Sequence, residues 1–240
     1  MASAEAHQLL ASQPQDACAC LNWQEVYGSR RAECGKALEF YLVTKRGVPG
    51  TKAKAAVGDE FCGKFFQHVN DNFCLNADFT HKPDHWSGKQ WCYVAPQCQQ
   101  LRGGRKVPGS QLSWKICSEQ DRQTRTMSPL QLDGIRGSQS LDLGLLAKFS
   151  YPIWQKDRWP ALERHFMRPG PLSGLRTDLQ EVVDAGEPML LDSKDGHPPF
   201  HVVVGQQIYR IDYKPGGKKA YFLGRMGEVN EIKCVKGCDQ

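Results

Sequence analysis

The segment HVVVGQQIYRIDY (His201–Tyr213) decides the fold of the C-terminal part of the chain. Its two halves are rich in branched and aromatic residues, which is typical of β-strands. Gly205 and Gln206 between the halves form a two-residue turn with glycine first, and this predicts a hairpin. We therefore expect a small antiparallel sheet at the C-terminus. The segments assigned to it are Met189–Leu191, His201–Val204, Gln207–Tyr213 and Ala220–Leu223.

Helical patterns precede this sheet. Ser128 followed by Pro129 is a good helix start, because serine caps the first turn and proline fits its first position. Gly186 lies just past the end of an amphipathic segment, where a helix commonly stops. The other helices predicted here are Asp142–Phe149, Trp159–Phe166 and Leu172–Ala185.

Cysteine is the most informative residue type. The chain has ten cysteines, and eight of them fall between Cys18 and Cys117. Dense cysteines in even number predict disulfides and an oxidising compartment. Zinc fits less well, because Cys18 and Cys20 are closer than the usual zinc-binding pair. The cysteines expected in disulfides are Cys18, Cys20, Cys34, Cys62, Cys74, Cys92, Cys98, Cys117, Cys234 and Cys238.

The pairing of these cysteines stays open, because eight cysteines in one region allow many arrangements. Cys234 and Cys238 stand apart and either pair with each other around Gly237 or tie the tail to the body. Residues Met1–Pro14 lack the apolar core of a signal peptide, so we expect that a targeting peptide has been removed.

The N-terminal half mixes helical and strand patterns. Apolar residues recur at helical spacing in Glu33–Val43 and Val57–Phe73, and we assign them to the core. Gln90–Val94 and Ser113–Cys117 have the composition of short strands that carry cysteines. The predicted fold is therefore α+β, with a disulfide-rich, loop-rich helical region followed by short helices and a small antiparallel sheet. Its parts are a flexible lead at 1–17, a disulfide-rich region at 18–126, and helices plus sheet at 127–240.

Composition and charge exclude several classes of protein. Lys and Arg number 31 and Asp and Glu 26, so the net charge is only +5, and nucleic-acid binding is not predicted. No apolar run is long enough for a transmembrane helix. No phosphate-binding loop, dinucleotide fingerprint or serine-hydrolase elbow occurs. The basic residues considered are Arg102, Arg105, Lys106, Arg122, Arg125, Lys214, Lys218 and Lys219, and they are interpreted as a solvated surface.

One pattern offers an enzymatic alternative. Cys34 begins a predicted helix, His201 starts an apolar strand, and Asp212 lies on the next strand. This order resembles that of the papain-like and bacteriocin-processing peptidases. The resemblance implies that the cysteine attacks the substrate, the histidine transfers the proton and the aspartate orients the imidazole. Gln24, ten residues before Cys34, would supply an oxyanion donor. Because Cys34 is one of eight clustered cysteines, we favour no catalytic residue and keep the cysteine hydrolase as the alternative.

The histidine-rich loop is considered as a metal site. His81 and His85 lie beside Asp78 and Asp84, but Pro83 prevents the two imidazoles from sharing one helix face. We therefore predict no metal and no cofactor.

Several segments resemble a cysteine-rich protein type of dinoflagellate algae. They are EFCGKFFQHVNDNFCLN (60–76), GKQWCYV (88–94), LRGG (101–104), SWKIC (113–117) and LDLGLLAKFSYPIW (141–154). The resemblance covers roughly residues 18–160. It implies an organelle-targeted, disulfide-rich protein, with the thylakoid lumen as one setting and an accessory subunit of a photosynthetic complex as one role.

The WCY and W-x-x-C pieces resemble parts of kringle and fibronectin type II modules, which makes a secreted carbohydrate- or protein-binding module the second alternative. Tryptophans in loop-rich regions are frequent at interfaces. The interface candidates are Trp86, Trp91, Trp114, Trp154 and Trp159. The function predicted first is a non-catalytic accessory protein that docks on a larger protein assembly, including a membrane-bound one, in an oxidising compartment.

Overall fold

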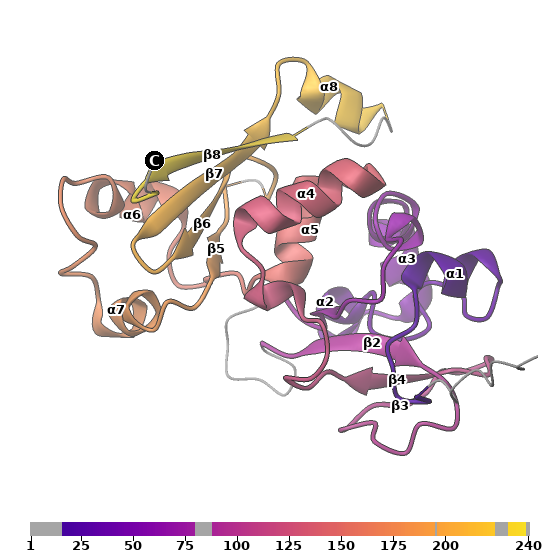
Figure 1. The fold of residues 1–240 in the computed structure, drawn as a ribbon. Helices are drawn as coiled ribbons and strands as arrows, with labels where there is room; N and C mark the ends of the chain where they lie inside the picture. Colours follow the sequence, from indigo (N-terminus) through magenta and orange to yellow (C-terminus); the bar gives the residue numbers. More distant parts are fainter. Residues whose placement is uncertain (1–15, 80–87, 195, 224–229, 239–240) are drawn as a thin grey trace, which may run out of the picture.

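A computed structural model describes residues 16–79, 88–194, 196–223 and 230–238 of the chain. Within these residues the strands form two four-stranded antiparallel sheets, and short helices make up the other regular elements (Figure 1). The fold is therefore α+β and disulfide-rich, as the sequence predicts. Most of the predicted flexible lead lies outside the described residues.

The N-terminal sheet has the strand order β1-β2-β4-β3. Its central strands are the two that the sequence predicts from QWCYV and SWKIC. Trp91 lies opposite Leu75 on one neighbouring strand and Ile116 on the other, and all three side chains are buried. The strands are β1 (Leu75–Asn76), β2 (Gln90–Val94), β3 (Arg105–Lys106) and β4 (Ser113–Ile116).

Short helices lie against this sheet. The Trp23 ring meets the Trp91 ring edge-on at a centroid distance of 4.8 Å, and Phe66 lies 5.2 Å from Trp23. These aromatic contacts join the helices to β2 in one core. The helices are α1 (Trp23–Gly28), α2 (Tyr41–Thr44), α3 (Gly50–Gly58), the π-helical turn η1 (Asp59–Gly63) and the 3₁₀ turns η2 (Phe66–His68) and η3 (Thr124–Thr126).

The single helix predicted at Val57–Phe73 is wrong, although its core assignment is right. The helix α3 ends at Gly58, and turns of different pitch follow. The disulfide of Cys62 and the stacking of Phe65 on Phe149 at 4.7 Å set the path of the chain there. Tertiary contacts of this kind override helical propensity.

The helix predicted at Glu33–Val43 is also wrong over most of its length. Gly35 has a φ of +95°, which only glycine adopts readily, and a Cβ there would lie 2.2 Å from the Phe40 ring. Glu39 is buried and its Oε2 accepts a hydrogen bond from the Ala37 N–H at 3.0 Å. These local contacts replace the helical hydrogen bonds.

The C-terminal sheet has the order β5-β6-β7-β8 and contains the predicted hairpin. Val204 pairs with Gln207, so Gly205 and Gln206 form the two-residue turn, and Gly205 has a φ of +56°. The strands are β5 (Met189–Leu191), β6 (Phe200–Val204), β7 (Gln207–Tyr213) and β8 (Asn230–Lys236).

The strand predicted at Ala220–Leu223 is wrong, because this segment belongs to helix α8 (Gly217–Phe222). Tyr221 is buried on one side of that helix, and its hydroxyl donates to Glu60 Oε1 at 2.7 Å. The fourth strand is instead β8, whose sequence NEIKCVK carries little of the apolar signal of an inner strand.

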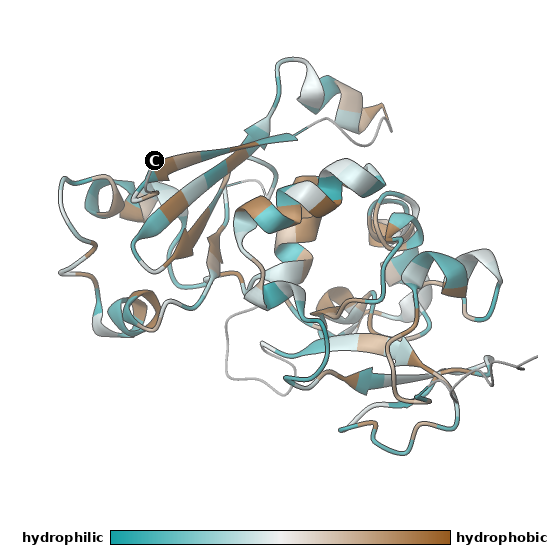
Figure 2. Ribbon diagram, viewed as in Figure 1, coloured by the Kyte–Doolittle hydropathy of each residue, from teal (hydrophilic) through white to brown (hydrophobic). Residues whose placement is uncertain are grey.

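Helices cover both faces of the C-terminal sheet (Figure 1). Val202 and Ile211 face α4 and α5 and belong to the large core, whereas Val203 and Ile208 face α6 and α7 and form a second core. Figure 2 shows hydrophobic residues gathered on α5 and on the strands beside it. The helices are α4 (Pro129–Gln139), α5 (Leu143–Ser150), α6 (Trp159–Phe166) and α7 (Thr177–Asp184). Helix α7 therefore begins five residues after the start predicted for it at Leu172.

Helix α5 joins the two halves of the chain. Its Lys148 carbonyl accepts from Asn76 Nδ2 at 3.1 Å, and its Ser150 carbonyl accepts from Gln90 Nε2 at 3.2 Å. The large core contains residues from both sheets. The two predicted regions therefore share one core across the boundary at residue 126.

All ten cysteines lie in the described residues and are paired. Disulfides in this number indicate an oxidising compartment rather than a reducing cytosol. Of the two alternatives for the C-terminal pair, the structure shows the bond between Cys234 and Cys238. The other disulfides are Cys18–Cys98, Cys20–Cys92, Cys34–Cys62 and Cys74–Cys117.

Candidate docking groove

The residues of the alternative cysteine hydrolase do not form a catalytic site in this structure. Cys34 is bonded to Cys62, so it offers no thiolate to a substrate. The hollow beside Cys34 is lined by neither His201 nor Asp212. Gln24 is exposed on α1 and does not line that hollow either.

The predicted histidine lies on the opposite side of the C-terminal sheet from the large core. His201 stacks on Trp159 with ring centroids 3.5 Å apart and planes at 8°. Burial lowers the pKa of His201 to about 4, with the Arg210 charge as the next cause. Asp212 forms an ion pair with Arg210. These contacts make His201 a buried aromatic neighbour rather than a base facing a substrate.

The described tryptophans among the interface candidates are inside the protein. All four are buried, with at most 8% of each residue exposed: Trp91, Trp114, Trp154 and Trp159. The prediction that they form a docking surface is therefore wrong, because these large apolar rings fill the two cores. Trp86 lies outside the described residues.

The histidine-rich loop adds nothing to the described site. His81, Asp84 and His85 lie outside the described residues. Asp78 is buried and forms an ion pair with Lys45.

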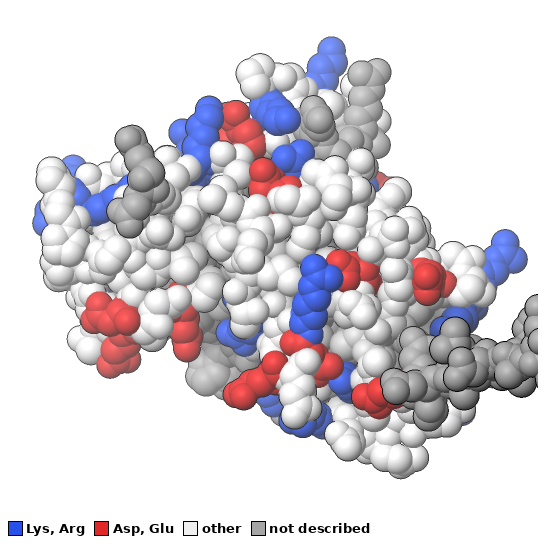
Figure 3. Space-filling model, viewed as in Figure 1, with Lys and Arg blue, Asp and Glu red and all other residues white. Residues whose placement is uncertain are grey.

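Most of the basic residues considered in the sequence are solvent-exposed, and some are paired. Arg122 forms an ion pair with Asp71 at 2.7 Å. Arg125 Nη1 donates a hydrogen bond to the Gly88 carbonyl. Figure 3 shows both signs of charge interspersed over one face, without a continuous field of one sign. Lys106 is different, because it lines a groove together with two arginines.

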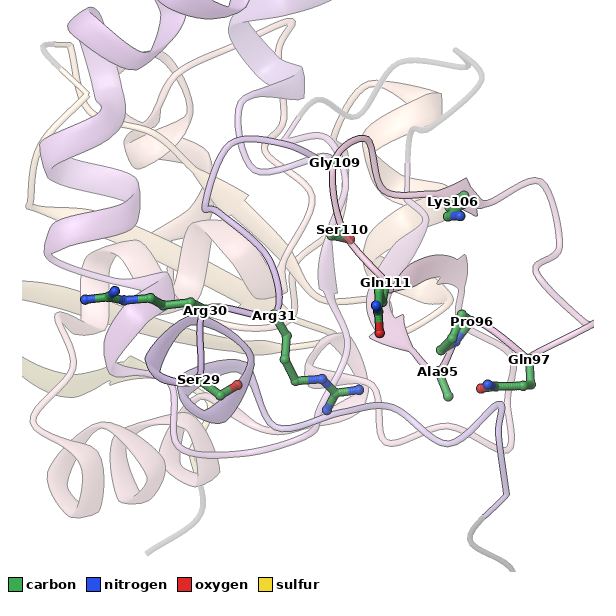
Figure 4. Close-up of a pocket in the computed structure, with 10 residues that line it drawn as sticks. All are labelled: Ser29, Arg30, Arg31, Ala95, Pro96, Gln97, Lys106, Gly109, Ser110 and Gln111. Carbon is green, nitrogen blue, oxygen red and sulfur yellow. The ribbon is translucent and has the colours of Figure 1, made fainter.

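This basic groove lies between α1, the end of β2 and the β3–β4 connection (Figure 4). Its volume is about 770 Å³, and it is open to solvent. Figure 4 shows Arg31 pointing into the space between the α1 turn and Gln111, whereas Arg30 points away from it. The lining residues are Ser29, Arg30, Arg31, Ala95, Pro96, Gln97, Lys106, Gly109, Ser110 and Gln111.

The charge of the groove is of one sign. Arg30, Arg31 and Lys106 are exposed and have no ion-pair partner in the described part of the chain. No carboxylate occurs among the described residues that line the groove. Other cations of the protein form ion pairs with carboxylates. Lys115 Nζ, for example, lies 2.7 Å from Asp121 Oδ1. The groove therefore attracts anions, and its polar lining suits a chain segment better than an apolar small molecule.

A buried carboxylate holds the two walls of the groove at a set distance. Glu39 Oε1 accepts a hydrogen bond from Tyr27 of α1 at 2.9 Å and another from Tyr93 of β2. Burial raises the pKa of Glu39 and, together with its charge, the pKa of both tyrosines. The disulfide of Cys98 also fixes the wall that contains Gln97. Such supports fix the shape of the groove in the protein on its own.

The end of α1 places the first two cations. Arg30 has a φ of +57°, and the N–H groups of Arg30 and Arg31 bond the carbonyls of Tyr27 and Val26 at 3.0 Å. This is a Schellman ending, in which the left-handed position usually belongs to glycine. The sequence interpretation missed both arginines. The available signal was SRRAEC (29–34), an adjacent arginine pair close to a cysteine.

Comparison of the chain with protein-family models, curated proteins and solved structures finds no match. The inference of function therefore depends on the residues of this chain. None of the helices in the described ranges has the length and apolar character that a membrane crossing needs.

Proposed function

We propose that this protein is a non-catalytic accessory protein that docks on a larger assembly in an oxidising compartment. Its basic groove holds an acidic segment of a partner protein. The observation that carries the proposal is a groove whose described lining includes three cations without an ion-pair partner and no carboxylate, with Arg31 pointing into the space. Five disulfides support an oxidising compartment. The two settings that we propose for it are the thylakoid lumen and the secreted space.

Charge complementarity argues for an acidic peptide as the occupant. Each exposed cation that meets a carboxylate contributes about 0.2–1 kcal/mol, so several contacts are needed for useful affinity. Electrostatic attraction also accelerates association and weakens as salt rises. A transient, salt-sensitive docking contact is therefore expected.

The test measures binding of a fluorescein-labelled oligoglutamate peptide by fluorescence anisotropy. The double variant Arg31→Ala/Lys106→Ala is expected to bind about tenfold more weakly at low salt, because two charge contacts are lost. The matched control is Lys52→Ala/Lys218→Ala, which removes the same charge from exposed positions outside the groove. The control is expected to bind like the wild type.

Equal weakening in both double variants would overturn the proposal, because net charge alone would then explain the binding. A single-stranded RNA oligonucleotide of similar charge serves as the competing ligand. Tighter binding of the RNA than of the peptide would identify a nucleic-acid partner and contradict the proposal.

A further inference from the structure

Two disulfides lie in contact beside the N-terminal sheet, Cys20–Cys92 and Cys74–Cys117. All four Sγ atoms lie within 4.8 Å of one another. The Sγ atoms of Cys20 and Cys74, which are not bonded to each other, are 3.7 Å apart. Within the described ranges this is the one place where three or more cysteine, histidine or acidic side chains converge in this way.

This spacing is close to that of a tetrahedral metal–thiolate centre. A zinc–sulfur bond of about 2.3 Å places neighbouring sulfurs about 3.8 Å apart. The Cys20–Cys74 separation already has this value. Once the two disulfide bonds are open, tetrahedral coordination requires the formerly bonded sulfurs to move apart, while no pair of sulfurs starts more than 4.8 Å apart.

We propose that, when both disulfides are reduced, Cys20, Cys74, Cys92 and Cys117 form a tetrahedral binding site for Zn²⁺. Four thiolates at tetrahedral spacing favour zinc over harder cations such as magnesium and calcium, which prefer oxygen ligands. Each of the four cysteines comes from a different stretch of chain, so the metal would replace the two covalent links with one coordination centre.

The reaction is balanced by a dithiol reductant. Each disulfide accepts two electrons and two protons from one dithiol, which itself becomes a disulfide. The reduced protein then has four thiols at the site. Zn²⁺ binds the four sulfurs as thiolates, and their four protons are released to solvent.

The surroundings allow a reductant to enter. Cys74 and Cys92 are fully buried, whereas Cys20 and Cys117 are partly exposed. Cys117 lines an open hollow of about 420 Å³ together with Ser118. A dithiol can therefore attack the Cys74–Cys117 bond from the solvent side, and the thiolate formed lies beside the second disulfide.

One cation lies at the edge of the cluster. Lys115 pairs directly with Cys92 across β2 and β4, and its side chain is 8% exposed. Asp121 accepts from Lys115 Nζ at 2.7 Å, and the same carboxylate oxygen lies 3.8 Å from Cys20 Sγ. The ion pair of Lys115 and Asp121 therefore lies at the edge of the cysteine cluster, where its two opposite charges offset each other.

The test uses the whole protein, reduced under nitrogen with a phosphine reductant, and Co²⁺ as the spectroscopic probe. Reduced wild-type protein is expected to bind one equivalent with intense visible bands and thiolate-to-cobalt absorption of a tetrahedral sulfur site, and Zn²⁺ is expected to displace it. The oxidised protein is expected to show neither band. Absence of the bands after reduction would contradict the proposal.

Matched variants separate this site from loose binding to any reduced cysteine. Cys74→Ser/Cys117→Ser is expected to abolish the tetrahedral spectrum, and Cys34→Ser/Cys62→Ser is expected to keep it. Equal loss in both would show unspecific thiolate binding and overturn the assignment. Because a variant can fail to fold, native mass spectrometry of the reduced wild type supplies a second readout. A mass increase of one zinc is expected, and several zincs or none would contradict the site.

Discussion

At the scale of single residues, two buried ionisable groups in the described part of the chain lack a full set of hydrogen bonds. Asp142 caps α5, with Oδ1 accepting from the Leu145 N–H at 2.7 Å and Oδ2 unpartnered. Burial raises the pKa of Asp142 to about 6 from an ordinary 3.8. His201 Nδ1 is also without a partner, and the pKa of His201 moves in the opposite direction.

The variant Asp142→Asn tests the first group. A carboxyl with a higher pKa in the folded state takes up its proton more readily there, so folding stability increases as pH falls from 7 through 6 towards 4. The unfolding free energy of the wild type is expected to gain about 3 kcal/mol relative to the variant over this range. Urea unfolding at a series of pH values measures the difference. A difference that does not change with pH would show that Asp142 ionises normally.

The variant His201→Phe tests the second group and keeps a flat ring on Trp159. A histidine with a lowered pKa binds its proton more readily in the unfolded chain, so stability decreases as pH falls from 6.5 to about 4. Relative to the variant, the wild type is expected to lose about 2 kcal/mol once solvent screening is included. Urea unfolding over the same pH series measures this loss of stability. A decrease of similar size in the variant would refute the prediction.

At the scale of elements, the end of α1 joins a backbone feature to the proposed docking. Arg30 occupies a left-handed position that costs an L-residue about 1 kcal/mol, and Arg102, in the connection between β2 and β3, has a similar φ of +53°. A residue with a local conformational cost is a candidate for function. Arg30 lines the basic groove, which fits this interpretation.

The variant Arg30→Gly is therefore expected to change stability and binding in opposite directions. The unfolding free energy should rise by up to about 1 kcal/mol, because glycine adopts this conformation readily. Affinity for the oligoglutamate peptide should fall at most about twofold, because Arg30 adds positive charge to the wall of the groove although its side chain points away from the space. Urea unfolding and anisotropy measure the two effects. A variant that is both less stable and unchanged in binding would contradict both parts of the argument.

Helix α5 shows how one element can serve two sheets. Leu143–Ser150 is buried along nearly its whole length, so its apolar residues face both the N-terminal helices and the C-terminal sheet. A helix that is hydrophobic on all sides belongs in an interior. The sequence predicts this helix correctly, but its position between the sheets follows only from the structure.

At the scale of the whole molecule, the disulfides differ in the length of chain that they close. Cys18–Cys98 spans 80 residues, whereas Cys234–Cys238 spans 4. Loop-closure entropy therefore makes the first disulfide the larger restraint on the unfolded chain.

Serine replacement of both members of each pair tests this difference. Cys18→Ser/Cys98→Ser is expected to lower the unfolding free energy by about 4 kcal/mol, and Cys234→Ser/Cys238→Ser by about 2 kcal/mol. Thermal and urea unfolding of the two variants measure the losses. Equal losses would show that contacts in the folded state, rather than loop length, decide the contribution of each disulfide.

Local signals in the sequence determined several elements of this protein. The start of α4 at Ser128–Pro129, the bounds of α6, the β6–β7 hairpin and the core role of the phenylalanines in Val57–Phe73 all follow from caps, turn residues and periodicity. These signals are readable because the residues that cause them lie within a few positions of one another. The disulfide-rich character follows from composition in the same way.

The tertiary structure alone decided the pairing of the cysteines, the burial of the tryptophans and the position of the groove. The groove brings Arg31 together with Lys106, which are remote in sequence, and Cys74 reaches Cys117 in the same way. Tyr221 of α8 likewise contacts Glu60, which is remote from it in sequence. Such features depend on which distant segments of the chain come into contact. Local sequence patterns do not specify those contacts, because they are set by the free energy of the complete fold.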